Sequence, residues 1–337
     1  MCNVPYKVLA CILNRRMVVY LPSLVSEEYH GFIKGWSIHA AIGLAHEIIA
    51  KIEQKTSFSN TVLKLDMSKA FERVEWPFIL KFLAGLGFSS WAIDLLFRCF
   101  SFAWLTINFM GKQFGFFKAV RGLRKGDPLS PTLFILAQDV LSRYFNRSIE
   151  RGRIIPYRNR HIAKGISRLM FADDTIIFVN RCCRSIQGIN DVLEEYVKWS
   201  GQLINREKSF FYMASYSSYR RVRNVENGLD MHHGSFPLEY LGASVSPKPL
   251  RIHHFDNLID KITGRFLNWK NRFFPFGSII TLINNVLTSI PIHVLSNLIA
   301  PNKVISKLEK LMVFFLWDDH LEIKHHWASW RRMVRNP

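Results

Sequence analysis

Three aspartates are the residues of this sequence best suited to chemistry. Asp173 and Asp174 stand side by side in LMFADDTIIFVN (169–180), and Asp66 ends the alternating stretch TVLKLD. Carboxylate oxygens are ligands that Mg²⁺ prefers, and two such ions about 3.5–4 Å apart can activate an attacking hydroxyl and hold a leaving pyrophosphate. A simpler interpretation is a hairpin turn, because Asp tolerates turn dihedral angles. This stretch alone leaves both interpretations open.

Strands must bring these aspartates together, because Asp66 and Asp173 lie 107 residues apart (173 − 66). The apolar runs on either side of the Asp-Asp pair predict two strands, and TVLKL predicts a third. We expect a central antiparallel sheet in which these strands are neighbours. Successive side chains of a strand face opposite ways, so Asp174 cannot occupy the position of Asp173 unless the turn rotates it. We therefore expect Asp173 to be the better metal ligand.

Hydrophobic periodicity and turn residues predict the remaining elements. The expected helices cover 5–20, 37–54, 77–86, 90–99, 126–145 (after an initial Gly/Pro loop), about 185–200, and most of the chain from 252 onward, with breaks at Pro275, Pro291 and Pro301. A hairpin is expected over 104–120, turning at 110–112, and short strands over 202–246. The mixed first part and the helical tail predict two lobes with a boundary near 247–251.

Charge and composition narrow the class of protein. Lys and Arg number 45 against 26 Asp and Glu, a net charge of +19, which predicts a polyanionic partner such as nucleic acid. Apolar residues make up 49% of the chain, which excludes disorder, and no apolar run reaches the roughly 18 residues of a membrane span. The five cysteines lack C-x-x-C spacing, so we expect a reduced, intracellular compartment. The paired histidines lack the cysteines that a zinc site would add.

Five short stretches occur together in one order: LKLDMSKAF, RGLRKGDPLSPTLF, FADD, GQLINREKS and YLGASVSP. They resemble polymerase motifs A to E of reverse transcriptases, and most closely those of plant non-LTR (LINE-type) retrotransposons. The resemblance implies an α+β right-hand polymerase fold with fingers, an antiparallel-sheet palm and a helical thumb. These parts would span 1–60 (partial fingers), 61–245 (palm), 246–320 (thumb) and 321–337 (a truncated C-terminal extension).

The function that this resemblance implies is RNA-directed DNA synthesis. A primer 3′-hydroxyl would attack the α-phosphate of a deoxynucleotide with the help of two Mg²⁺ ions, or Mn²⁺ in their place. The implied partners are an RNA template, a DNA or RNA primer and deoxynucleoside triphosphates, with no membrane and no specific protein partner. Because enzymes of this family work at chromosomal DNA, the implied location is nuclear or cytoplasmic.

The resemblance also implies roles for single residues near the reacting atoms. Asp66, Asp173 and Asp174 correspond to the catalytic metal ligands, with the backbone carbonyl of Met67 as a further ligand. Phe71 corresponds to the aromatic residue that leaves no room for the 2′-hydroxyl of a ribonucleotide. The simpler interpretation of Phe71 is a core aromatic.

Further matches concern the nucleotide, the template and the primer. Lys125 and Gly126 correspond to the loop beneath the incoming nucleotide, and Ser130 and Pro131 to its continuation beneath the template. Lys208 corresponds to a proton donor to pyrophosphate, against the simpler interpretation of a solvated lysine. The hairpin that grips the primer end would be formed by Tyr240, Leu241 and Gly242.

Some positions depart from the family pattern, which has Gln at Lys125, Arg at Trp36 and Asp at Glu72. Because Trp36 lacks the cation that helps to hold a triphosphate, we expect weak or absent synthesis, improved by Trp36→Arg with Lys125→Gln. By comparison with the family, we also expect the segment and the endonuclease domain that usually come first to be missing. A catalytically degenerate, nucleic-acid-binding remnant is therefore the alternative hypothesis. An RNA-dependent RNA polymerase is disfavoured by Phe71.

Overall fold

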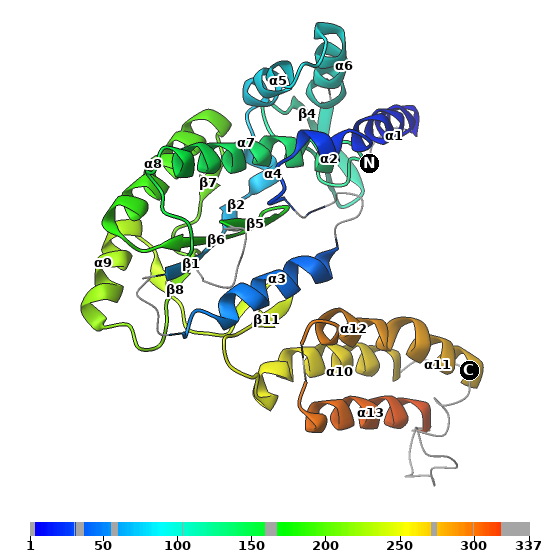
Figure 1. Cartoon of the computed structure of the whole chain (residues 1–337). Coiled ribbons are helices and arrows are strands. Elements are labelled where there is room, and N and C mark those ends of the chain that lie inside the picture. The colour runs from blue at the N-terminus through cyan, green and yellow to red at the C-terminus, as the bar shows by residue number, and fades with distance from the viewer. Residues whose placement is uncertain are drawn as a thin grey trace. The chain divides into compact units, whose positions relative to one another are not determined.

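A computed structural model describes residues 4–29, 31, 37–54, 60–102, 104–158, 167–270, 275–298 and 300–317. The chain forms two compact units, Met1–Phe236 and Pro237–Pro337 (Figure 1). The division falls about ten residues before the expected boundary near 247–251, because the hairpin that starts at Leu238 belongs to the helical second unit. Trp36 and the C-terminal extension 321–337 lie outside the described residues.

A five-stranded sheet with the order β5-β6-β1-β8-β9 forms the centre of the first unit. Its strands are β1 (Asn60–Leu65), β5 (Arg168–Phe171), β6 (Asp174–Asn180), β8 (Phe210–Tyr212) and β9 (His232–His233). Strand β1 pairs antiparallel with β6 on one side and with β8 on the other, and β5 and β6 form a hairpin. The prediction that the strand before Asp66 lies next to the Asp-Asp hairpin is confirmed.

Helices cover both faces of this sheet, as Figure 1 shows. The helices concerned are α3 (Ile38–Ala50), α7 (Ser130–Glu150) and α8 (Cys183–Ser200). Leu63 and Ile177, which pair across β1 and β6, point into a core shared with α7 and α8. On the opposite face, Tyr157 packs edge-on against Phe178 of β6 and donates a hydrogen bond to the Ile48 carbonyl of α3. The two faces of the sheet are therefore anchored by different helices.

Smaller elements complete the described part of the first unit. The helices are α1 (Val4–Val18), α2 (Leu21–Leu24), α4 (Ala70–Arg73), α5 (Trp76–Gly85), α6 (Ser90–Ser101) and α9 (Tyr219–Leu229). The strand pairs are β2 (Met67–Ser68) with β7 (Leu203–Ile204), and β3 (Trp104–Phe109) with β4 (Lys112–Lys118). The hairpin expected over 104–120 is thus confirmed, and so is the end of α8 at Gly201, whose φ is +70°.

Helix α9 was not expected, because only strands were predicted over 202–246. Its sequence is rich in charge, and only Val225 and Leu229 are fully buried, one turn apart. Val222, Val225 and Leu229 nevertheless recur at the three- and four-residue spacing of one helix face, a signal that sequence reasoning did not use. The contacts of α9 with α8, including that of Gly228 with Ile186, hold this segment as a helix.

The second unit joins a β-hairpin to a group of helices. Its elements are β10 (Leu238–Tyr240), β11 (Ala243–Val245), the 3₁₀ helix η1 (Ile252–Phe255), α10 (Asp256–Lys270), α11 (Phe276–Leu282), the π-helix η2 (Ile283–Leu287), α12 (Ser289–Leu295) and α13 (Asn302–Trp317). Pro275 and Pro301 precede helices as expected, but Pro291 lies inside α12. The backbone widens into η2 just before it, which relieves the clash that proline makes with the carbonyl four residues earlier. Among the described helices, none is long and apolar enough to cross a membrane.

Candidate active site

The Asp-Asp pair lies at a tight turn between β5 and β6. Phe171 pairs with Asp174, so the two turn residues are Ala172 and Asp173. Ala172 has a φ of +52°, a left-handed conformation that costs energy for a residue with a Cβ and that recurs at functional sites. Asp173 is exposed at the turn, whereas Asp174 is half-buried as the first residue of β6. The hairpin interpretation of this stretch is correct, and it leaves both carboxylates available for chemistry.

Asp66 lies beside this turn because of the register between β1 and β6. Leu65 pairs with Thr175, so the next position along each strand sets Asp66 opposite Asp174. Directly opposed residues of antiparallel strands share a face and have Cα atoms about 4.5–5.5 Å apart. Residues alternate between faces, so these two aspartates share the face of Lys64 and not the face that packs on α7 and α8.

The charges of the three aspartates act on one another. The pKa of Asp174 is raised above its ordinary value, first by burial and then by the negative charges of Asp173 and Asp66, while Lys64 opposes the shift. Within the described residues, no group of three or more His, Cys, Asp or Glu side chains is arranged to hold a metal ion. The site is therefore a set of neighbouring, mutually repelling carboxylates and not a closed metal cage.

The segment 205–209 is bound to the backbone of Asp66. The amide of Asp66 donates to Ser209 Oγ at 3.0 Å, and its carbonyl accepts from the Asn205 amide at 2.9 Å. The next residue, Met67, is buried and pairs with Ile204 of β7. Lys208 is exposed in this turn, and its amide donates to Asn205. The structure thus brings the sequence neighbourhood of Lys208 to the end of β1.

A segment near the N-terminus supports the Asp-Asp turn from outside the sheet. The amide of Met170 donates to the Glu28 carbonyl at 3.1 Å, and Tyr29 is fully buried. Gly31 lies so close to the turn that a Cβ on it would be 2.9 Å from the Ala172 amide nitrogen. Sequence reasoning missed Gly31, because only the three-dimensional contact shows that this glycine cannot carry a side chain.

A buried polar network holds β5, the strand that leads into the turn. Arg168 is fully buried, and its guanidinium contacts Glu28 at 3.1 Å and Ser142 Oγ of α7 at 2.8 Å. Burial lowers the pKa of Arg168 to about 10, against the favourable charges of Glu28 and Asp139. Asp139, also fully buried, accepts from the Ser26 amide at 2.9 Å. An arginine at the start of an otherwise apolar strand was the sequence signal for this network, and sequence reasoning did not use it.

Phe71 is half-buried on α4, and its ring is held by the core. It stacks on Phe134 of α7 with ring centres 4.1 Å apart and planes 13° apart. The carbonyl of Phe71 accepts from the Leu123 amide at 2.7 Å. A Cβ at Gly122 would lie 2.5 Å from the Glu72 carbonyl oxygen, so the loop 121–126 rests directly on α4.

Lys125 and Glu72, which both depart from the family pattern, contact each other. Lys125 Nζ and Glu72 Oε1 form an exposed ion pair 3.0 Å apart. The hydrogen bond and the charge of Lys125 lower the pKa of Glu72. Lys125 is therefore engaged by Glu72 beside Phe71. Gly126, the next residue, has a φ of +80°, a backbone conformation that requires glycine. The space around its missing Cβ is open, so crowding within the chain is not the reason.

Ser130 and Pro131 begin α7, as predicted, and the loop before them is tied down by Asp127. This buried carboxylate pairs with Arg124 at 3.3 Å, accepts from the Leu129 amide at 3.0 Å and accepts a hydrogen bond from the Tyr6 hydroxyl of α1. Burial and the bond to Asp127 raise the pKa of Tyr6.

Comparison with known proteins identifies the family of this chain. Residues 1–245 match the sequence profile described as "Reverse transcriptase (RNA-dependent DNA polymerase)". This chain belongs to the reverse transcriptase family.

Relatives of this reverse transcriptase come from mobile elements and from a plant organelle. An uncharacterised mitochondrial protein of Arabidopsis thaliana is 44% identical over 77 residues, which is 23% of this chain and 62% of that protein. The Pol polyprotein of the R2 retrotransposable element of Popillia japonica is 28% identical over 183 residues, 54% of this chain and 28% of its own length. The 149 kDa protein of the Xenopus laevis transposon TX1 is 22% identical over 96% of this chain and 24% of that protein. The expected kinship with non-LTR retrotransposons is confirmed.

The solved structures show the fold. Telomerase from Candida tropicalis, in complex with a fragment of telomeric RNA, matches with a TM-score of 0.50 at 12% identity, over 88% of this chain and 45% of that chain. The prediction of an α+β right-hand polymerase fold is confirmed. This reverse transcriptase spans 62% or less of the length of each of the three curated relatives described above.

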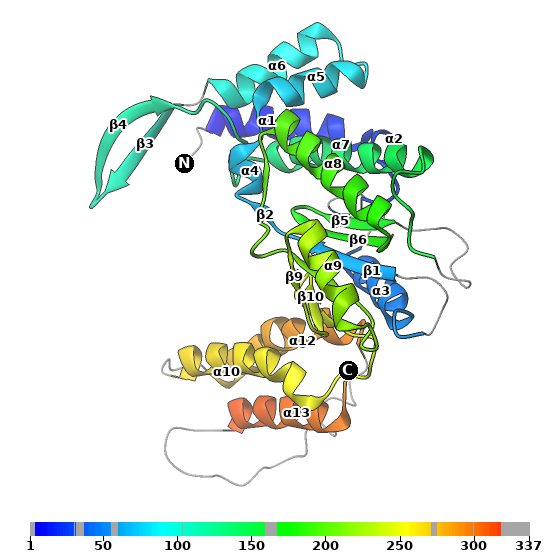
Figure 2. The same ribbon diagram turned by 90° about the vertical axis from the view of Figure 1, so that its left-hand side faces the viewer.

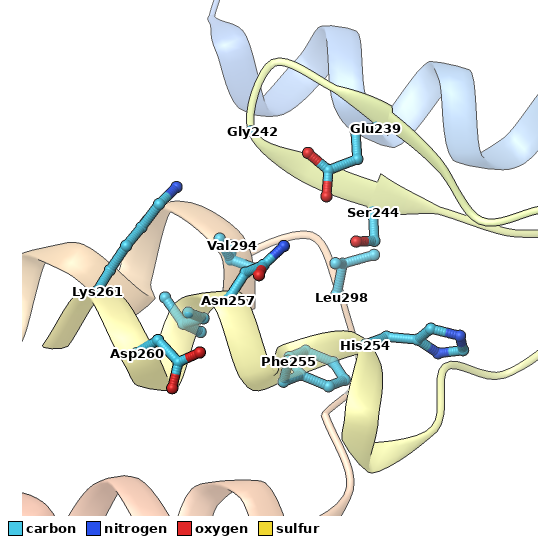
Figure 3. Close-up of a pocket in the computed structure, with 11 residues that line it drawn as sticks. Glu239, Gly242, Ser244, His254, Phe255, Asn257, Asp260, Lys261, Val294 and Leu298 are labelled. Atoms are coloured by element: carbon cyan, nitrogen blue, oxygen red, sulfur yellow. The ribbon is translucent and has the colours of Figure 1, made fainter. Parts of the chain in front are cut away.

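The hairpin expected to grip the primer belongs to the second unit. Tyr240 pairs with Ala243, and the tight turn between them consists of Leu241 and Gly242, with φ values of +50° and +80°. Tyr240 is only 1% exposed, whereas Gly242 in the turn and Glu239 of β10 are exposed. Beside it lies a cavity of about 380 Å³ between the hairpin and α10. Figure 3 shows Glu239, Ser244, His254 and other lining side chains of this cavity.

Proposed function

We propose that this chain carries out RNA-directed DNA synthesis as part of a retroelement protein. A primer 3′-hydroxyl attacks the α-phosphate of a deoxynucleotide selected by an RNA template, and pyrophosphate leaves. The observation that supports this most directly is the register of β1 and β6, in which Leu65 pairs with Thr175, so that the next residues, Asp66 and Asp174, come next to the Asp173 turn. Membership of the reverse transcriptase family supports the same reaction.

Asp66, Asp173 and Asp174 are the proposed holders of two Mg²⁺ ions, or of Mn²⁺ in their place, with the Met67 carbonyl as a further ligand. When bound, the metal supplies a lowered pKa for the attacking hydroxyl and positive charge for the leaving pyrophosphate. The raised pKa of Asp174 supports this, because a divalent cation relieves repulsion among carboxylates. Mg²⁺ takes several ligands from water and substrate phosphates, so its site does not require a cage made of protein alone.

Phe71 is the proposed selector of deoxynucleotides. Its stacking on Phe134 holds the ring in one place, so that it cannot swing away from an incoming 2′-hydroxyl. Lys208 is the proposed proton donor to pyrophosphate. Its exposure, and the bond between the neighbouring Ser209 and Asp66, support this role.

Nucleotide, template and primer contacts are proposed for the positions given by the family motifs. These are Lys125 and Gly126 for the nucleotide, Ser130 and Pro131 for the template, and Tyr240, Leu241 and Gly242 for the primer end. The proposed parts remain fingers over 1–60, palm over 61–245 and thumb over 246–320. We place the activity in the nucleus or cytoplasm, because the family works at chromosomal DNA.

A catalytically weak, nucleic-acid-binding remnant is the second candidate. Two observations favour it: the described carboxylates do not form a three-residue metal group, and Lys125 is engaged by Glu72 beside the nucleotide position. A ribonucleotide polymerase is disfavoured by the proposed role of Phe71, whose ring would exclude a 2′-hydroxyl.

The deciding experiment is primer extension on a primed RNA template with Mg²⁺ and deoxynucleotides. The polymerase proposal predicts incorporation by the parent chain and its loss in Asp173→Asn. Glu150→Gln, an exposed carboxylate at the C-terminal end of α7, is the matched control and should retain incorporation. A parent chain that binds the primed template but extends it no faster than Asp173→Asn would favour the remnant. Preferential incorporation of ribonucleotides would contradict the role of Phe71.

A further inference from the structure

The hairpin of β3 and β4, here called the aromatic hairpin, is exposed along almost its whole length. Every residue from 106 to 118 is exposed, and Figure 2 shows the two strands extending away from α5 and α6. Phe109, Phe114 and Phe116 are 61%, 51% and 72% exposed. Soluble proteins rarely leave rings gathered in this way in contact with water unless the patch binds something.

The register of the aromatic hairpin separates an apolar face from a polar face. Paired residues share a face and neighbours alternate. On this basis the apolar face carries Leu105, Ile107, Phe109, Phe114 and Phe117, with Lys112 paired to Phe109. The pairs Asn108–Gln113 and Trp104–Lys118 belong to the other face, called the polar face. The apolar face is thus dominated by aromatic rings at alternate positions of two adjacent strands.

The charge of this region identifies the occupant of the apolar face. The sequence contains no Asp or Glu between Asp94 and Asp127, and the two strands carry Lys112 and Lys118. Lys112 pairs with Phe109 on the apolar face, and on the polar face the ammonium of Lys118 lies 4.8 Å from the centre of the Trp104 ring, so both faces present a cation beside a ring. A second copy of the chain, with its own charge of +19, is repelled by this surface, whereas a polyanion is attracted.

We propose that the aromatic hairpin is an auxiliary binding site for single-stranded nucleic acid. Its rings stack on nucleobases, and its lysines neutralise phosphates, a combination that binds single strands with little sequence preference. The site is additional to the carboxylates at the end of β1 and requires neither metal nor nucleotide. This proposal can therefore be tested independently of the proposed polymerase reaction.

The test is binding of a fluorescein-labelled oligothymidylate to the full chain, measured by fluorescence anisotropy without Mg²⁺ or nucleotides. Phe109→Leu with Phe114→Leu keeps the face apolar but removes two stacking rings. Stacking contributes about 1–3 kcal/mol per base, so Kd should rise about 5- to 150-fold for each base that loses its ring. The dependence of Kd on salt should stay the same, because no cation is lost. Phe109→Tyr with Phe114→Tyr should restore the parent Kd.

Two further variants separate stacking from charge. Asn108→Ala with Gln113→Ala, on the polar face, is the matched control and should leave Kd unchanged. Lys112→Gln should reduce the slope of log Kd against log salt by about 0.7, the value for one phosphate contact on a single strand. Far-UV circular dichroism of each variant shows that the hairpin is retained.

Three results would overturn the proposal. The first is a Kd of the leucine variant within twofold of the parent. The second is a dimer of the parent, seen by analytical ultracentrifugation, that the leucine substitutions dissociate while oligonucleotide binding is unchanged. The third is binding to phosphatidylserine-containing vesicles that depends on Phe109 and Phe114 while oligonucleotide binding does not. Because the assay measures no synthesis, each of these results leaves the polymerase proposal untouched.

Discussion

Gly31→Ala should displace the turn that carries Asp173 without removing any functional group. The new Cβ would lie 2.9 Å from the Ala172 amide nitrogen, about 0.5 Å inside the 3.4 Å at which ordinary contact begins, and 3.3 Å from Phe171 Cα. Both atoms belong to the backbone, so no flexible side chain can move aside. The turn, or the segment around Gly31, must therefore shift by roughly 0.5 Å.

The size of the effect follows from this displacement. Catalytic groups must be held to within about 0.5 Å, and a misplacement of 1 Å costs roughly 100-fold in rate. A shift of half that size should lower kcat for deoxynucleotide incorporation about tenfold. KM for the nucleotide should change little, because the atoms nearest to the new Cβ belong to Ala172, Phe171 and Tyr29 and not to the proposed nucleotide site. Overpacking of this kind should also lower the free energy of unfolding by about 1–3 kcal/mol.

Primer extension and urea unfolding measure the two effects separately. Gly85→Ala is the matched control: nothing lies within 4 Å of its Cβ, and alanine in a helix is favoured over glycine by about 1 kcal/mol, so rate should hold and stability should not fall. If Gly31→Ala were destabilised but incorporated nucleotides at the parent kcat, the turn would not be catalytic. If it matched the parent in both measurements, the close contact between Gly31 and Ala172 would be refuted.

Other consequences of the structure can be tested with single substitutions. Glu72→Gln should free Lys125 and lower the KM for deoxynucleotide about two- to fivefold, a small factor because the ion pair is exposed. Lys125→Gln alone should raise that KM by a similar factor. Steady-state primer extension measures both KM values, and equal values would show that the pair lies away from the nucleotide. Arg168→Met should lower the free energy of unfolding by about 3–5 kcal/mol, because Glu28 and Asp139 lose a buried cation. Urea unfolding measures this loss, with Arg220→Met at an exposed position as the control. Similar losses in both variants would contradict the prediction. Burial lowers the pKa of His46 below its ordinary 6.5, so the unfolded chain takes up the proton at higher pH than the folded chain does. The free energy of unfolding should therefore fall as the pH falls through about 6.5 and below. His46→Gln should reduce that loss between pH 7.5 and 5, and an identical loss in the variant would exclude His46 as a contributor.

The interaction of Lys125 with Glu72 changes one expectation drawn from the sequence. Lys125→Gln was expected to improve synthesis together with Trp36→Arg, because the two substitutions restore the residues of the family pattern. The ion pair shows that Glu72 would lose its partner in that variant. A glutamine at 125 is therefore better tested with Glu72→Asp or Glu72→Gln in the same chain.

The sequence by itself determined the local elements and the identity of the candidate site. The hairpin around Asp173, the strand that ends at Asp66 and the end of α8 at Gly201 could be predicted, because alternation of apolar residues and turn chemistry act over a few neighbouring residues. The order of the five motifs likewise indicated the family before any contact was known.

Tertiary structure alone decided which distant residues support that site. It put Ala172, not Asp174, in the turn, brought Gly31 against it and paired Lys125 with Glu72, residues 53 positions apart. These outcomes depend on strand register and on packing between segments far apart in the chain, and neither leaves a periodic signal in the residues that take part.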